Sequence, residues 1–214
     1  MTDVLKNYEF WLSVITVLAA VIALFQSHKQ VKISNRQALL DRRINKFLLF
    51  KDLLANYSNS ITLLEESILS QDVEFPFIYL TNCSSLEMIA NVMKTPLSHE
   101  EKNLFLTKCE ELEKSAIEVE LIFKSSVSKY MAEFIIVYKK LLQAMHRQQI
   151  ALNGLKDNNF DQKSCMSLDI FQEKAHDWAE KNKLYETADT LKKLYQLIND
   201  REVEKKIRKE ISLI

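Results

Sequence analysis

The first strong pattern along the chain is a stretch of eighteen residues, 10–27, without a charged side chain. Its central part, residues 14–25, is apolar around the whole circumference of a helix except at Thr16, whereas helices of soluble cores usually keep a polar stripe. Eighteen helical residues span roughly 27 Å, close to the thickness of the hydrocarbon layer of a membrane. The stretch therefore predicts a transmembrane helix.

Two other interpretations of this stretch stay open, a cleaved signal peptide and a buried helix of a soluble core. A signal peptide begins with a basic region, but here Lys6 stands between Asp3 and Glu9, and no small-x-small cleavage site follows the apolar residues. For a membrane anchor, the side chains expected to contact lipid are Phe10, Trp11, Leu18, Val21, Leu24 and Phe25.

Basic residues are distributed unequally around the predicted span. Only Lys6 precedes it, and six follow it closely: Lys29, Lys32, Arg36, Arg42, Arg43 and Lys46. Positive charge is retained on the cytoplasmic side of a membrane. We therefore expect a single-pass protein of the cytoplasmic (inner) membrane, with residues 1–9 outside and residues 28–214 in the cytosol. Lys29, Lys32 and Arg36 either contact anionic headgroups or serve only as a topology signal.

The next pattern is a spacing of three and four residues between apolar positions, which is typical of helical bundles and coiled coils. It first predicts one long helix through residue 70, with Arg42 and Arg43 paired to neighbours such as Asp41 or to a partner protein. A shorter helix is expected at about residues 77–94. Ser98 and Glu101 form a capping box for a third. The seam of the first helix consists of Leu40, Ile44, Phe47, Lys51, Leu54, Tyr57, Ile61, Leu64 and Ile68.

The C-terminal half continues this spacing. A break at residues 124–126 separates two antiparallel helices, Asn153-Gly154 predicts a helix end, and residues 156–163 predict a polar loop. A last long helix from about residue 171 continues through Ile211, and its end either docks on its own bundle or offers an apolar stripe to a partner. The fold class expected is all-α: a transmembrane helix that continues into a cytosolic antiparallel bundle of about four to five helices.

Composition agrees with this picture and excludes several functions. One glycine and two prolines among 214 residues disfavour sheets with tight hairpins and cannot build a glycine-rich phosphate loop. The 29 basic and 29 acidic residues give no net charge, which argues against nucleic acid as a partner. Three widely spaced cysteines indicate a reducing compartment.

Candidate chemistry is sparse. His99 precedes two glutamates, but Asn103 stands where a zinc protease has its second histidine. Glu173 and His176 have the spacing of di-iron carboxylate sites, but such sites need the motif twice, so an ordinary surface pairing such as His176 with Glu180 is favoured. No arginine is followed by histidine at the spacing of small helical nucleases. We therefore expect no enzymatic activity, no metal, no cofactor and no small-molecule substrate.

Two short stretches resemble a loose group of small bacterial proteins. They are residues 34–43, SNRQALLDRR, and the helix end Leu121-Ile122-Phe123 followed by residues 127–131, VSKYM. The resemblance covers about a tenth of the chain. It implies a bacterial inner-membrane protein with an N-terminal anchor and a helical cytosolic domain, and it implies no reaction.

Three functions are compatible with these patterns. The preferred hypothesis is a helical protein, anchored in the lipid bilayer, that acts at the inner face of the membrane by binding other proteins or further copies of itself. The alternative is an effector of bacterial stress or phage defence that perturbs the bilayer on clustering, with Ser13, Thr16, Ala19, Ala20 and Ala23 as a helix–helix face. An enzyme with an unrecognised site is the third.

Overall fold

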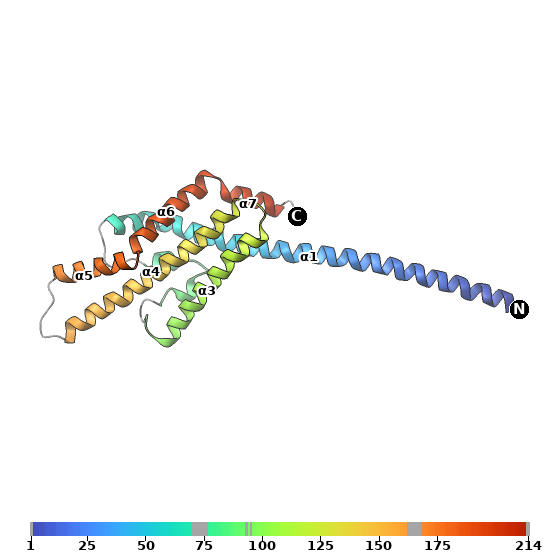
Figure 1. Ribbon diagram of the computed structural model, residues 1–214, viewed down its shortest axis with the longest axis horizontal. Helices are drawn as coiled ribbons and strands as arrows, with labels where there is room; N and C mark the ends of the chain where they lie inside the picture. Colours follow the sequence, from blue (N-terminus) through green and yellow to red (C-terminus); the bar gives the residue numbers. More distant parts are fainter. Residues whose placement is uncertain (1, 70–76, 93, 95, 162–167, 213–214) are drawn as a thin grey trace. The chain divides into compact units, whose positions relative to one another are not determined.

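In a computed structural model, which describes residues 2–69, 77–92, 94, 96–161 and 168–212, the chain is all-helical (Figure 1). The fold class predicted from the sequence is confirmed at this level, because no strand occurs among these residues. By compactness the chain divides into two units, Met1–Arg42 and Arg43–Leu213. The helices are α1 (Thr2–Leu69), α2 (Phe77–Thr81), a short 3₁₀-helix η1 (Glu87–Ile89), α3 (His99–Ile122), α4 (Ser128–Asp161), α5 (Leu168–Lys181), α6 (Leu184–Asp200) and α7 (Val203–Ser212).

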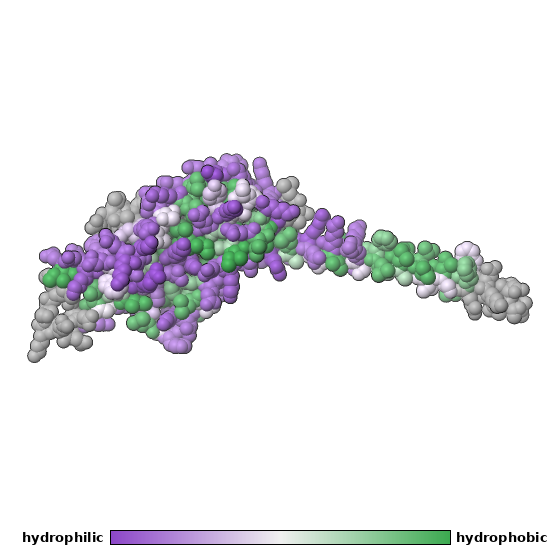
Figure 2. Space-filling view, viewed as in Figure 1, coloured by the Kyte–Doolittle hydropathy of each residue, from purple (hydrophilic) through white to green (hydrophobic). Residues whose placement is uncertain are grey.

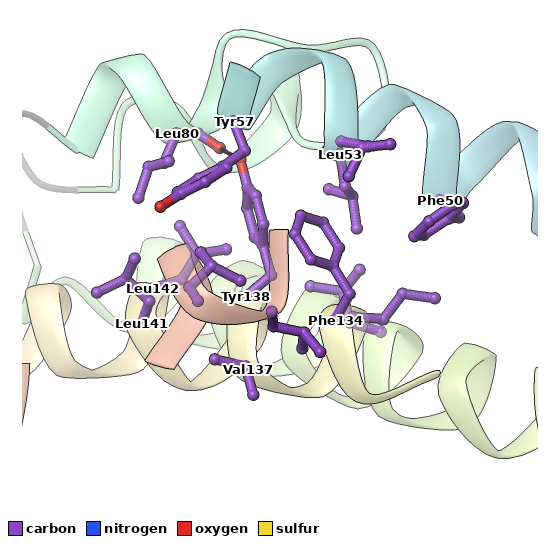
Figure 3. Packing of buried hydrophobic residues seen from close by; sticks show 14 of the residues in the cluster. Phe50, Leu53, Tyr57, Leu80, Phe134, Val137, Tyr138, Leu141 and Leu142 are labelled. Carbon is purple, nitrogen blue, oxygen red and sulfur yellow. Dashed lines mark hydrogen bonds between the residues drawn. The ribbon is translucent and has the colours of Figure 1, made fainter. Parts of the chain in front are cut away.

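The core of the second unit forms around the part of α1 that begins at Arg43. Of the predicted seam, Phe47, Leu54, Tyr57 and Leu64 are buried and Ile44 is exposed, while the Ile68 side chain lies outside the described residues. Phe50 and Leu53, which the predicted seam does not include, are fully buried beside Tyr57. Figure 3 shows these side chains directed toward Phe134 and Tyr138 of α4. The ring of Phe134 meets those of Phe50 and Tyr57 edge to face, with centroids 5.8 and 6.1 Å apart. Buried aromatic residues therefore join α1 to α4.

Helices α3 and α4 form an antiparallel pair, as the sequence predicts. The Ser98 hydroxyl accepts a hydrogen bond from the backbone N–H of Glu101 at 3.3 Å and caps α3. Near the middle of the pair, Lys139 contacts Glu113 at 2.9 Å. The predicted break at residues 124–126 is confirmed, since α3 ends at Ile122 and α4 begins at Ser128.

The predicted helix over residues 77–94 is wrong in length. Helix α2 ends at Thr81, and turns with the 3₁₀-helix η1 follow. The cause is a competing set of hydrogen bonds, in which the Ser84 hydroxyl and the Ser85 hydroxyl and N–H all donate to the Asp52 carboxylate. Serine groups that bond elsewhere in this way replace helical hydrogen bonds with a turn.

The predicted helix end at Asn153-Gly154 is also wrong, because α4 continues to Asp161. Gly154 does not adopt the left-handed conformation that ends helices at glycine. The Gln149 amide donates to the Asn153 side-chain oxygen at 2.9 Å, one turn apart, and Leu152 is buried. These contacts keep the turn helical, so residues 156–161 of the expected loop are helical instead, and residues 162–163 lie outside the described residues.

The predicted last helix is three helices, α5, α6 and α7. Lys183 and Glu202 separate them with φ values of 55° and 49°, in the left-handed region. Each of the three helices buries apolar side chains, among them Ala179, Leu191 and Ile207. The expected number of four to five bundle helices is therefore too low, because two bends turn the apolar faces of the three helices toward one core.

Candidate functional site

The N-terminal part of α1 presents apolar side chains that this chain does not bury. An 18-residue window near the start of the helix has a mean hydropathy of 2.1 and contains no buried residue. The helix is therefore long and apolar enough to cross a membrane. Figure 2 shows this segment in green, followed by hydrophilic residues in purple. The predicted lipid-contacting residues have exposed fractions of 43–73%: Phe10, Trp11, Leu18, Val21, Leu24 and Phe25.

A polar side chain within this segment, Thr16, is compatible with the hydrocarbon layer of a membrane. The Thr16 hydroxyl donates to the Leu12 carbonyl oxygen at 2.8 Å, one turn earlier in the same helix. This bond satisfies the hydroxyl without water, as hydroxyls inside membranes require. Lys29, Lys32 and Arg36 are exposed and follow the window within about three turns.

Arg43, by contrast, is a buried basic residue with an exposed fraction of 4%. Its Nε donates to the Ile122 carbonyl oxygen at 2.7 Å, its guanidinium lies 5.5 Å from the centre of the Phe123 ring, and Nη2 is 3.6 Å from the Glu210 carboxylate. The expectation that Arg43 pairs with Asp41 or a partner protein is therefore wrong. The structure places this arginine among α1, the end of α3 and α7.

Glu210 completes this junction. Its carboxylate accepts hydrogen bonds from the backbone N–H groups of Lys124 and Ser125 at 2.6 and 3.2 Å. One carboxylate of α7 thus holds both the α3–α4 connection and Arg43 of α1. Sequence reasoning missed Glu210, because local spacing carries no signal for a pair that only the tertiary fold brings together.

A second polar cluster lies inside the second unit. The Asn56 amide donates to the Tyr138 hydroxyl at 2.9 Å, and that hydroxyl donates to the Leu80 carbonyl oxygen at 2.6 Å. Burial raises the pKa of Tyr138 far above its ordinary value, so the phenol stays protonated at neutral pH. This cluster links α1, α2 and α4 and offers no general base.

The two cysteine thiols that the structure describes, Cys83 and Cys109, are unsuited to nucleophilic chemistry. Burial raises the pKa values of Cys83 and Cys109 to about 11, and the thiolate is the reactive form of cysteine. At Asp52, hydrogen bonds from Ser85 and Ser84 outweigh the effect of burial and lower the pKa of the carboxyl group. Asp52 is thus an ionised structural acceptor for the turn at residues 84–85.

The histidines do not converge on one site. His146 is buried, stacks on Phe105 with 4.4 Å between ring centroids, and has Nε2 3.2 Å from the Pro96 carbonyl oxygen. His176 lies 3.3 Å from the Tyr185 hydroxyl rather than in the expected pair with Glu180. Among the described residues, no group of three or more His, Cys, Asp and Glu side chains is placed to hold a metal ion.

Comparison of the chain with protein-family models, with curated proteins and with solved structures finds no significant match.

Proposed function

We propose that the chain is a single-pass protein of the cytoplasmic membrane whose helical unit, an antiparallel bundle, works on the cytosolic side by binding proteins or further copies of itself. The observation that carries this proposal is the unburied 18-residue apolar window of α1. Burying such a surface in lipid is favourable by about 25 cal/mol per Å² of apolar area. The flanking basic residues Lys29, Lys32 and Arg36 support the orientation.

The proposed absence of catalysis is supported by the environments of the groups that catalysis would use. Tyr138, Cys83 and Cys109 are held protonated by burial, and the buried His146 ring faces a carbonyl oxygen and an aromatic ring. Arg43 and Glu210 form a charged pair whose members also bond backbone groups of the same chain. Their role in this proposal is to fix the helical unit rather than to act on a substrate.

Fractionation with a topology reporter tests the proposal. The full chain should stay with membranes after alkaline carbonate extraction, and a reporter fused to its C-terminus should be active only in the cytosol. Recovery of the intact chain in the soluble fraction, or a reporter active outside the cytosol, would contradict the proposal.

Binding of partners and perturbation of the bilayer are separated by a second measurement. If the chain acts through protein binding, its overproduction leaves the membrane potential, read with a potential-sensitive dye, unchanged. A collapse of the potential on induction would favour the alternative, a bilayer-perturbing effector.

A further inference from the structure

The bend between α6 and α7 is not imposed by the residue types found there. Glu202 has a left-handed backbone, φ 49°, at the position after a helix where glycine is the usual residue. Backbone bonds from Arg201 to Leu197 and from Glu202 to Asn199 close the end of α6. Residues 182–214 contain neither glycine nor proline. The sequence is thus suited to one continuous helix, and the bend depends on what α7 contacts.

Helical phase shows what a straight helix would do. The buried residues Ile198 of α6 and Val203 of α7 are five residues apart, which corresponds to a rotation of about 140° around a continuous helix. If α6 stayed on its own core, a straight α7 would direct Val203 and Ile207 away from that core. These two side chains are fully buried in the bent form, so they would need an apolar surface on another molecule.

The surface that fits α7 is visible in the bent form. Glu204 contacts Lys51 at 3.5 Å, the Arg208 guanidinium lies 5.8 Å from the centre of the Phe47 ring, and Glu210 bonds the α3–α4 connection and Arg43. We call this surface the α7 groove, defined by Arg43, Phe47, Lys51 and residues 124–125. A second copy carries the same α7 and can make the same contacts.

The hinge lies at the surface of the second unit. An open groove of ≈ 420 Å³ runs beside it, lined among others by Leu54, Asn199 and Lys205.

We propose that two copies of the chain exchange α7: in each copy α6 and α7 join into one straight helix, and α7 occupies the α7 groove of the other copy. The exchange retains the contacts of Val203, Ile207 and Glu210 and removes the left-handed conformation of Glu202. This inference rests on the proposed function in that it names the partner, a second anchored copy, through which the helical unit acts.

Charge reversal at the groove tests the exchange with full chains in mild detergent. In Arg43→Glu and in Glu210→Arg, positions 43 and 210 of one chain carry like charges. When the two variants are co-expressed and exchange α7, opposite charges meet in both grooves. Native mass spectrometry should then show the heterodimer at least about tenfold above either homodimer, because like-charge contacts disfavour the homodimers. The double variant R43E/E210R is the control: it restores opposite charges within one chain but not the backbone hydrogen bonds of Arg43 and Glu210, so its homodimer should exceed that of either single variant.

The hinge provides a second measurement with milder substitutions. Glu202→Gly favours the left-handed bend and should reduce dimerisation, whereas Glu202→Ala favours a straight helix and should increase it. We expect dimer dissociation constants about tenfold apart or more, since two hinges contribute to each dimer. Lys183→Gly is the matched control, because Lys183 is also left-handed but precedes α6. Its dimerisation should equal that of the unaltered chain.

A statistical mixture of the charge variants, monomers under all conditions, or equal dimerisation of E202G and E202A would each overturn the exchange. A side-by-side dimer without exchange gives the first of these results, because like charges stay within each chain. Membrane fractionation of the same variants tests the proposed anchor separately, because it does not depend on dimerisation. Membrane-bound monomers would therefore reject the exchange and leave the proposed anchor in place.

Discussion

Two parts of helix α1 are equally helical but differ in what their apolar side chains contact. In residues 10–27 apolar side chains surround the helix and none in the apolar window is buried. From Arg43 onward, the buried apolar side chains lie on one face, and those at Phe50 and Leu53 are fully buried. Hydropathy alone therefore does not define a core residue. The angular distribution of apolar residues indicates whether the chain can cover them itself or needs another environment.

The largest effect is expected from charges placed in the first of these parts. The double substitution Leu18→Arg with Val21→Arg should remove the chain from membranes, because each arginine at the centre of a span costs about 3 kcal/mol. The fraction resistant to carbonate extraction measures this loss. Leu48→Arg is the control, since Leu48 is 55% exposed but belongs to the second unit. A double variant that remains resistant would show that lipid is not the environment of this part.

In the second part, a substitution should affect folding rather than location. Phe134→Ala removes the ring that packs edge to face against Phe50 and Tyr57, and should lower the free energy of unfolding by about 3–5 kcal/mol. Urea unfolding in detergent, followed by circular dichroism, measures the change. Phe25→Ala, at a position 73% exposed, should change it by less than about 0.5 kcal/mol. Equal effects of the two substitutions would remove the distinction between the two parts of α1.

A smaller loss is expected from the polar cluster that joins α1 to α4. Tyr138→Phe removes one hydroxyl and leaves the Asn56 amide and the Leu80 carbonyl oxygen without this partner. The expected decrease in the free energy of unfolding is about 1–3 kcal/mol, measured by the same urea titration. Tyr79→Phe, at a half-exposed ring, is the control and should leave the titration unchanged. An unchanged titration for Tyr138→Phe would mean that the cluster contributes no stability.

Periodicity and caps made much of the fold predictable from the sequence. The cap at Ser98 and the break before Ser128 depend on neighbouring residues, and these two predictions were correct. The seam of α1 was correct only in part, because Ile44 is exposed and the fully buried Phe50 and Leu53 were not included. The helix end at Gly154 and the single last helix were wrong, because tertiary contacts decide whether a turn stays helical or bends.

Some candidate site residues could be predicted from local patterns in the sequence, and others depend on tertiary contacts. The apolar residues of the proposed anchor form a local pattern that the sequence alone reveals, whereas the pairing of Arg43 with Glu210 exists only after α1 and α7 meet. The five-residue step between Ile198 and Val203 was present in the sequence. It signals a bend or an exchange, because residues five apart do not share a helix face.

The smallest effect concerns pH and separates His146 from the exposed His99. Burial lowers the pKa of His146, although the hydrogen bond to the Pro96 carbonyl oxygen opposes this shift. The unfolded chain therefore binds the proton more tightly than the folded chain. The contribution of His146 to stability should be constant above the ordinary pKa of about 6.5 and should fall as the pH decreases through it.

Urea titrations at pH 5.5 and 7.5 should show this decrease in the unaltered chain and in His99→Gln. In His146→Gln, whose amide can still donate to the carbonyl oxygen, the difference between the two pH values should shrink. A difference of the same size in His146→Gln would assign the pH dependence to other groups.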